Sequence, residues 1–181
     1  MYLANIITLG RLLSVPLVVW LILDGSMLPA FILFLLAGVS DAVDGFLARR
    51  FDQRSELGGY LDPLADKALL VGVYVTLGHV GRVPDWLVIL VVFRDLLIIG
   101  GAILLYMFTD ALRMEPLTIS KVNTAMQIVL AAAVLGVAGL QVDDHGAVGL
   151  LVYLVGVTTI LSGAAYIHQW SRRVAGAGGS R

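Results

Sequence analysis

The chain contains no cysteine among its 181 residues. Without a thiol there is no disulfide, no thiolate ligand for a metal and no cysteine nucleophile. Histidine is also scarce, with only three copies in the sequence. Metal binding and proton transfer by this chain are therefore expected to rest on carboxylates and other oxygen groups.

Charged residues are few as well. Only 14% of the residues are Asp, Glu, Lys or Arg, and 12 basic against 13 acidic residues give a net charge of −1. Because the basic residues form no stripe, the sequence gives no sign of nucleic-acid binding. Hydrophobic residues make up 59% of the chain, and the mean hydropathy is +0.94. Soluble domains are usually about 45–50% apolar, so the composition predicts an integral membrane protein embedded in the lipid bilayer.

Long apolar segments recur along the chain. A membrane-spanning helix needs roughly 20 apolar residues, and the connections between the candidate segments are short. We therefore predict an all-α integral membrane fold, a six-transmembrane-helix bundle that forms one domain over residues 1–174. The glycine-rich residues 175–181 predict a flexible tail. The six segments are 7–23, 28–47, 57–77, 86–108, 122–140 and 147–170.

The basic residues predict the orientation of this multi-pass protein. If both termini lie on one side of the bundle, eight basic residues fall on that side and only Arg82 falls on the other. Loops rich in Lys and Arg remain cytoplasmic, so we expect the termini and the 49–56 connection in the cytoplasm, as in a bacterial inner membrane. The eight residues are Arg49, Arg50, Arg54, Arg113, Lys121, Arg172, Arg173 and Arg181.

An acidic run between two apolar segments carries the strongest functional signal. Asp41 and Asp44 are three residues apart, and Asp62 and Asp66 are four apart, so on two helices each pair would project from one face. Carboxylates that converge beside a bilayer repel one another and are costly to desolvate unless cations neutralise them. Such ligands suit Mg²⁺ or Mn²⁺, and Mg²⁺ commonly bridges substrate phosphates. The run predicts a phosphate-handling metal site at a membrane surface.

The same run resembles the CDP-alcohol phosphatidyltransferase family. It matches the pattern D-x2-D-G-x2-A-R-x8-G-x3-D-x3-D at every fixed position. A solvated charged loop would explain the acids but not their spacing or the glycines. The resemblance implies transfer of the phosphatidyl group of CDP-diacylglycerol to an alcohol with release of CMP, by a membrane-bound homodimer. The fixed positions are Asp41, Asp44, Gly45, Ala48, Arg49, Gly58, Asp62 and Asp66.

The resemblance assigns roles to the four aspartates. Two Mg²⁺ or Mn²⁺ ions held by Asp41, Asp44, Asp62 and Asp66 would stabilise both the attacking and the leaving oxygens. The acceptor hydroxyl must lose its proton as it attacks, and a carboxylate within hydrogen-bond reach is the available base. Asp66 is the expected catalytic base, because the final aspartate of the family motif combines metal ligation with proton acceptance.

Other residues of the run are candidates for binding the CDP-lipid. Arg49 can hold a phosphate through two parallel hydrogen bonds. Gly45, Ala48 and Gly58 would let the backbone approach the nucleotide, although small residues also serve tight helix packing in membranes. Ser55 matches a hydroxyl that binds the CDP-lipid in relatives, and it equally suits a helix N-cap.

Three polar residues outside these positions are further substrate-binding candidates. Asn5 and Thr8 are polar in a region where exposure to lipid would be costly, so their face is expected to look into the protein. Lys67 directly follows Asp66, where it would neutralise the acidic cluster or bind the phosphate of the acceptor.

Three candidates lie in the later apolar segments. Arg94 is expected either to bind substrate or to form a structural buried pair with Asp95, because a charge pair costs less in a membrane than either charge alone. Lys121 opens the fifth segment on the side where an anionic acceptor would enter. Asn123 extends this polar face, and hydrogen bonding between helices is the alternative role for it.

The acceptor is not identified by the aspartate pattern. Segments 61–67, 83–95 and 119–128 resemble CMP-forming cardiolipin synthases, which join CDP-diacylglycerol to phosphatidylglycerol. Phosphatidylglycerophosphate synthases, which use glycerol-3-phosphate, are similar over the same length. They tend to carry a Lys-Trp-Lys-Thr-type segment at 121–124 and a glutamate in place of Asp95. We expect phosphatidylglycerol to be the acceptor, with glycerol-3-phosphate as the alternative.

A transporter and a membrane prenyltransferase are the two alternative functions of a different class. A transporter would place its acids near the bilayer midplane, commonly within inverted repeats, whereas these acids gather at one edge and no repeat is visible. A membrane prenyltransferase would need two aspartate-rich motifs on separated helices and more spans. Metal-dependent release of CMP from a CDP-lipid would distinguish the phosphatidyltransferase from both.

Overall fold

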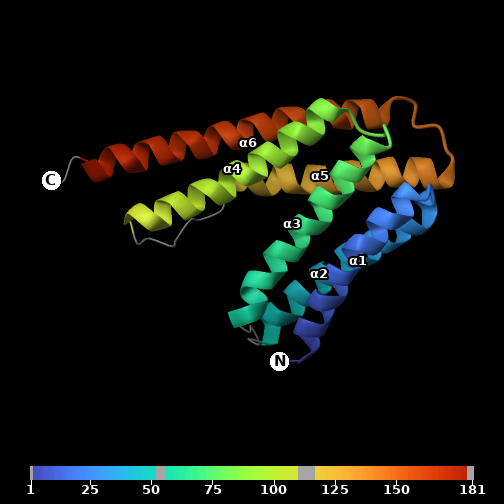
Figure 1. Ribbon diagram of the computed structural model, residues 1–181, viewed down its shortest axis with the longest axis horizontal. Helices are drawn as coiled ribbons and strands as arrows, with labels where there is room; N and C mark the ends of the chain where they lie inside the picture. Colours follow the sequence, from blue (N-terminus) through green and yellow to red (C-terminus); the bar gives the residue numbers. More distant parts are fainter. Residues whose placement is uncertain (1, 52–55, 110–116, 179–181) are drawn as a thin grey trace. The chain divides into compact units, whose positions relative to one another are not determined.

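The computed structural model describes the backbone of residues 2–51, 56–109 and 117–178, and the side chains of residues 10–40, 67–101 and 117–172. Within these ranges the chain forms helices and turns with no strand, which confirms the all-helical prediction (Figure 1). The helices are α1 (Tyr2–Leu23), α2 (Met27–Phe51), α3 (Glu56–His79), α4 (Asp85–Thr109), α5 (Thr118–Leu140) and α6 (Ala147–Gly178).

Each helix contains one of the predicted apolar segments and extends past it, because helical hydrogen bonding continues into polar residues that a hydropathy pattern does not mark. The sequence predicted a tail from residue 175, and the backbone of residues 175–178 continues α6 to Gly178. Alanine residues in this stretch favour helix elongation. Two described helices are long and apolar enough to cross a membrane, at Thr118–Leu140 and Ala147–Arg172. The six-span bundle and the single domain therefore stay predictions.

Contacts divide the described chain into two compact units. Unit 1 comprises Met1–Pro84 and Ala131–His145, and unit 2 comprises Asp85–Leu130 and Gly146–Arg181. In unit 1, α1 packs against both α2 and α3 (Figure 1). The fully buried side chains at its core include Val18, Ile22, Val73, Tyr74 and Leu77. These apolar residues recur three or four positions apart, so they lie on one face of each helix, and this is the face that α1 and α3 bury.

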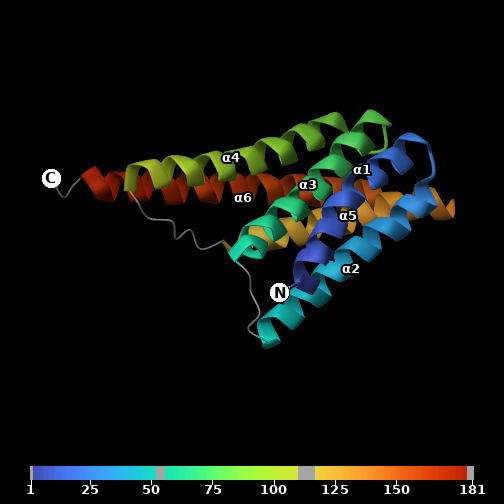
Figure 2. The ribbon, with the colours of Figure 1, turned by 60° about the horizontal axis from the view of Figure 1, so that its bottom comes forward.

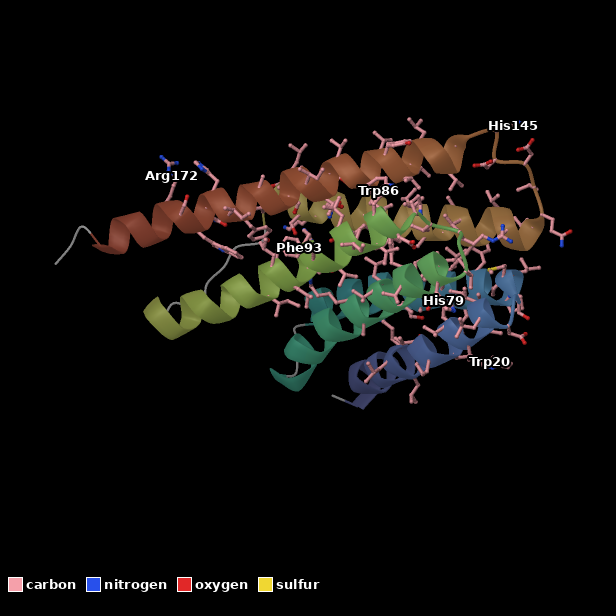
Figure 3. All side chains as sticks on the ribbon, turned by 45° about the horizontal axis from the view of Figure 1, so that its top comes forward. Trp20, His79, Trp86, Phe93, His145 and Arg172 are labelled. Carbon is pink, nitrogen blue, oxygen red and sulfur yellow. The ribbon has the colours of Figure 1, made fainter. Side chains whose placement is uncertain are left out.

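Two helices of unit 1 end in the same way, which keeps their connections short. Gly25 after α1 and Gly81 after α3 have positive φ angles of 81° and 72°. In each case the glycine N–H and the following N–H donate back to the last turn, as in Gly25 to Ile22 at 3.1 Å and Ser26 to Leu21 at 2.9 Å. Glycine adopts this left-handed conformation without steric cost. Trp20 and His79 lie near these two helix ends (Figure 3).

The end of α5 packs closely on the start of α2 within unit 1. A Cβ atom at Gly139 would lie 2.7 Å from the Cα of Leu28 and 2.8 Å from its nitrogen. One turn earlier, a Cβ atom at Gly136 would lie 3.2 Å from the ring of Phe31. Small residues that allow such close backbone approach are typical of helix packing in membranes.

Replacing Gly139 with alanine is expected to destabilise the protein by about 1–3 kcal/mol. The added methyl group would clash with backbone atoms of Leu28, which cannot move aside by a side-chain rotation. Gly38→Ala is the matched control, since a Cβ atom there meets nothing within 4 Å. Thermal unfolding of both variants in detergent measures the effect. Equal melting temperatures for Gly139→Ala and Gly38→Ala would contradict the close approach.

In unit 2, α4 and α6 lie side by side and run in the same direction (Figures 1 and 2). Trp86 near the start of α4 covers Gly156 of α6, where a Cβ atom would come within 2.9 Å of the indole ring. Trp170 of α6 covers Gly101 of α4 in the same manner. Two tryptophans that each fill the space above a glycine of the opposite helix fix the register of this pair.

Candidate active site

The four predicted metal ligands lie on two helices of unit 1. Asp41 and Asp44 belong to the second half of α2, and Asp62 and Asp66 to the first half of α3. The helical backbone at these positions agrees with the three- and four-residue spacing on which the pairing argument rests. The aspartate side chains themselves lie outside the described ones.

The case for a divalent cation rests on the chemistry of the four aspartates and not on an observed cluster of ligands. Among the described side chains, no group of three or more His, Asp or Glu residues lies close enough to hold a metal. The four aspartates are not part of that set. Carboxylate oxygens are the ligands that Mg²⁺ and Mn²⁺ prefer, so the residues present at 41, 44, 62 and 66 suit such an ion chemically.

Most of the other candidates around the run are placed by their backbone alone. Asn5 and Thr8 lie in α1, Gly45, Ala48 and Arg49 in α2, and Gly58 in α3. Ser55 lies outside the described residues. Lys67 in α3 is described and partly buried. The predicted roles of these residues in binding substrate stay predictions.

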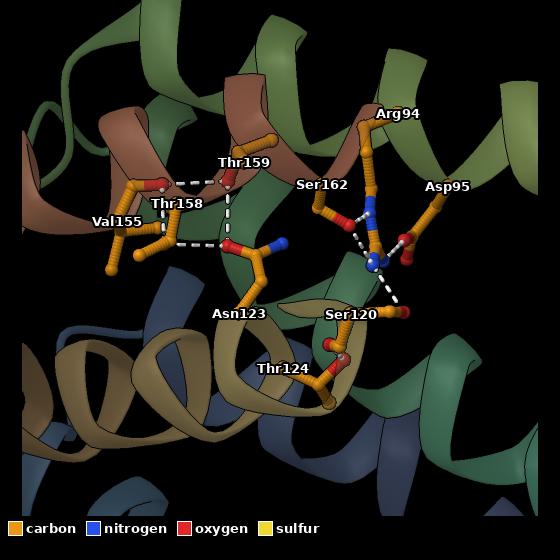
Figure 4. A network of polar contacts seen from close by, with 9 residues as sticks. All are labelled: Arg94, Asp95, Ser120, Asn123, Thr124, Val155, Thr158, Thr159 and Ser162. Carbon is orange, nitrogen blue, oxygen red and sulfur yellow. Dashed lines mark hydrogen bonds and ion pairs between the residues drawn. The ribbon is translucent and has the colours of Figure 1, made fainter. Parts of the chain in front are cut away.

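Arg94 lies at the centre of a buried polar cluster in unit 2 (Figure 4). Its side chain and that of Asp95 are almost fully buried, with Nη1 only 2.6 Å from Oδ1 of Asp95. Ser162 of α6 accepts hydrogen bonds from Nε at 3.1 Å and from Nη2 at 2.7 Å. Ser120 of α5 accepts a further bond from Nη2 at 2.5 Å. The buried Arg94–Asp95 pair considered from the sequence is therefore present, and it connects three helices.

Asn123 forms a second polar contact between α5 and α6. Its Oδ1 atom accepts hydrogen bonds from the hydroxyl groups of Thr158 at 2.8 Å and Thr159 at 2.9 Å. The side chain is fully buried, and its Nδ2 atom has no hydrogen-bond partner within the described part of the chain. Hydrogen bonding between helices, the alternative role for Asn123, is thus observed. The Nδ2 group of Asn123 remains without an acceptor among the described residues.

Lys121 differs from these neighbours because it is exposed. It follows Ser120 directly in the first turn of α5, so the residue before it is bonded to Arg94 while Lys121 itself is exposed. An exposed ammonium group next to a fixed backbone is suited to bind an anionic group as a point charge.

The hydroxyl groups of this cluster were not predicted from the sequence. Thr158, Thr159 and Ser162 occupy positions three and four apart in an otherwise apolar helix. That spacing was the available signal, because polar residues at helical spacing in an apolar segment indicate one inward-facing surface. Ser120 carried no such signal of its own.

A shallow depression lies along residues 165–172 of α6 in unit 2. Its volume is about 500 Å³, and it is lined by Leu117, Ala165, His168, Gln169 and Arg172. His168 and Arg172 are exposed and lie one turn apart in α6. Figure 3 shows Arg172 near the end of the part of α6 whose side chains are described. The depression combines three nitrogen-bearing side chains, those of His168, Gln169 and Arg172, with the apolar side chains of Leu117 and Ala165.

Comparison with known proteins gives a family for this sequence. Residues 1–167 match the family model of CDP-alcohol phosphatidyltransferase. A chloroplastic CDP-diacylglycerol–glycerol-3-phosphate 3-phosphatidyltransferase from Oryza sativa subsp. japonica is 38% identical over 91% of this chain and 55% of its own length. The human cardiolipin synthase (CMP-forming) is 32% identical over 94% of this chain and 62% of its own length.

A probable cardiolipin synthase (CMP-forming) from Drosophila melanogaster is 32% identical over 92% of this chain and 57% of its own length. The chain thus spans little more than half the length of these curated relatives. The matched region nevertheless includes the whole aspartate run and nearly all of the described helices. The chain belongs to the CDP-alcohol phosphatidyltransferase family, a membrane-associated family of phospholipid synthases.

Proposed function

We propose that this chain transfers the phosphatidyl group of CDP-diacylglycerol to an alcohol and releases CMP. The observation that carries the proposal is the aspartate pattern on α2 and α3, which matches the family at all eight fixed positions inside the region covered by the family model. The names of the relatives support the same chemistry, since they are phosphatidyltransferases or CMP-forming synthases.

Phosphatidylglycerol is the proposed acceptor, which makes cardiolipin the product. The names of the human and Drosophila relatives support this choice, as do the segments around Asp95 and Lys121. The rice relative acts on glycerol-3-phosphate according to its name and is 38% identical, so glycerol-3-phosphate is the second candidate. Both acceptors combine a free hydroxyl group with an anionic phosphate group.

Asp41, Asp44, Asp62 and Asp66 are the proposed ligands of one or two divalent cations, in keeping with the general metal dependence of the family. Such cations, when bound, neutralise the negative charge of the pyrophosphate. Asp66 accepts the proton of the acceptor hydroxyl as its oxygen forms a bond to the phosphatidyl phosphorus. The bond between that phosphorus and the CMP oxygen breaks, so that CMP leaves with the electron pair.

Neighbouring residues bind and orient the CDP-lipid in this proposal. Arg49 holds a phosphate oxygen pair, and Gly45 and Gly58 allow close backbone approach to the nucleotide. Asn5, Thr8, Ala48, Ser55 and Lys67 complete the proposed substrate-binding set. In unit 2, the spare Nδ2 group of Asn123 is a donor for a substrate oxygen, because it lacks a partner among the described residues.

Lys121→Ala is expected to raise the apparent KM for phosphatidylglycerol about tenfold, with little change in the KM for CDP-diacylglycerol. The reason is that the exposed ammonium group binds the phosphate of the acceptor and so orients its hydroxyl group. Arg82→Ala is the matched control, since Arg82 is also exposed but lies on the predicted opposite side of the membrane. A lower melting temperature with unchanged kinetics per folded molecule would contradict the role of Lys121 in binding the acceptor.

The six helices span the membrane in this proposal, as one domain over residues 1–174 within a homodimer, and both termini face the cytoplasm. The absence of cysteine allows a direct test by labelling. A cysteine at position 181 should be protected from an impermeant thiol reagent in sealed right-side-out cells, whereas a cysteine at position 82 should react. The reverse pattern would overturn the orientation.

Product analysis decides between the two acceptors. Purified protein would receive labelled CDP-diacylglycerol with either phosphatidylglycerol or glycerol-3-phosphate. Labelled cardiolipin with the first and no product with the second is the expected result. Product formed from glycerol-3-phosphate alone would reject the cardiolipin assignment and leave the phosphatidyltransferase activity standing.

A further inference from the structure

Arg94 makes more contacts than charge neutralisation requires. Asp95 alone would balance the guanidinium charge, and it does so from the adjacent position on the same helix. Three further hydrogen bonds nevertheless lead from Nε and Nη2 to Ser162 of α6 and Ser120 of α5. The guanidinium group is planar and keeps its charge, so its rigid fork fixes the positions of both hydroxyl groups (Figure 4).

These contacts hold the first turns of α5 in unit 2. Ser120 is joined to α4 through Arg94, and Asn123, three residues later, is joined to α6 through Thr158 and Thr159. Because the two residues lie about one turn apart, the start of α5 is tied at two successive points along its length. Arg94 is 3% exposed and Asn123 0% exposed, so burial of these two side chains limits the competition of water for their bonds.

Lys121 lies between these two attachment points. Its neighbour Ser120 is partly buried in the cluster, whereas Lys121 is exposed. The direction of the Lys121 side chain therefore depends on the rotation of α5, which Ser120 and Asn123 set. A shift of about 1 Å in a group that binds a reactant can cost on the order of 100-fold in rate.

We infer that Arg94 is a positioning residue that fixes the first turn of α5 through Ser120 and so presents Lys121 to the anionic group of the acceptor. This role rests on the proposed function of Lys121. Arg94 does not touch the substrate; it acts through the hydroxyl groups of Ser120 and Ser162. The acceptor side of the reaction depends on the cluster, while binding of CDP-diacylglycerol does not.

Ser120→Ala tests this inference most cleanly, because it removes one bond and leaves the Arg94–Asp95 pair intact. We expect the apparent KM for phosphatidylglycerol to rise about tenfold and the KM for CDP-diacylglycerol to stay within about twofold. Ser120→Thr keeps the hydroxyl group and should restore the parent KM. Ser171→Ala is the matched control, since that exposed hydroxyl group donates only to the carbonyl of His168 within α6.

A second readout is independent of activity. Spin labels would be placed through cysteines at Val122 of α5 and Leu161 of α6, which are 46% and 53% exposed. The distribution of distances between them should be narrow in the parent and in Ser120→Thr, and broader in Ser120→Ala.

The combined results separate the possibilities. An unchanged KM in Ser120→Ala, or a raised KM with an unchanged distance distribution, would overturn the positioning role. If the parent protein fails to release CMP while Ser120→Ala still shows the expected broadening, the proposed function is overturned, but the role of Arg94 in fixing the start of α5 is not. Broadening together with the selective rise in the acceptor KM is the supporting result.

Discussion

Asp66→Asn is expected to reduce CMP release about 1000-fold while leaving the protein folded. Asparagine has nearly the same size as aspartate but neither accepts the acceptor's proton nor carries charge for a cation, and loss of general base catalysis alone typically costs 10²- to 10⁴-fold. The measurement is the initial rate of CMP release per folded molecule, with folding checked by thermal unfolding in detergent.

The matched control for this variant is Asp85→Asn. Asp85 is exposed in the first turn of α4 and lies outside the aspartate pattern, so its replacement should leave the rate of CMP release within about twofold. Near-parent turnover in Asp66→Asn would show that another group takes the proton.

Asp95→Asn is expected to destabilise the protein by about 3–5 kcal/mol, because it leaves the guanidinium charge of Arg94 buried without its counter-ion. The carboxylate lies 2.6 Å from Nη1, and both side chains are almost fully buried. A large drop in melting temperature in detergent is the expected measurement. Because asparagine can still accept a hydrogen bond from Arg94, the loss of stability measures the loss of the negative charge and not the loss of the hydrogen bond.

A double replacement checks the explanation. Substituting apolar residues for both members of a buried ion pair is often neutral or stabilising, so Arg94→Met combined with Asp95→Leu should recover most of the lost melting temperature. It should not recover the acceptor KM, because the bonds to Ser120 and Ser162 are gone. A single Asp95→Asn variant as stable as the parent would contradict the importance of the pair.

The helices were predictable because their apolar segments are long and the connections short. The ends of the helices were harder to predict. The turns at Gly25 and Gly81 depend on a backbone conformation that the hydropathy pattern does not encode, and α6 continues through residues that composition alone assigns to a tail. Hydropathy locates the part of a helix that lipid or the protein core can cover, and hydrogen bonding decides where the helix stops.

The candidate site was predictable where the signal is local. The aspartate spacing lies within one continuous run, and the Arg94–Asp95 pair joins adjacent residues. The bonds from Arg94 to Ser120 and Ser162 join residues 26 and 68 positions away. They depend on the parallel register of α4 and α6, which is fixed by the packing of Trp86 on Gly156 and Trp170 on Gly101. A single sequence does not specify this register, so these partners were missed.

The most direct test of the account is release of CMP from CDP-diacylglycerol by the purified protein. The account predicts that CMP appears in equal amount to the phosphatidylated alcohol, that release requires both an acceptor alcohol and Mg²⁺ or Mn²⁺, and that chelation of the cation abolishes it reversibly. A folded protein that releases no CMP with phosphatidylglycerol, glycerol-3-phosphate or any other alcohol in the presence of these cations would contradict the assignment of phosphatidyltransferase activity.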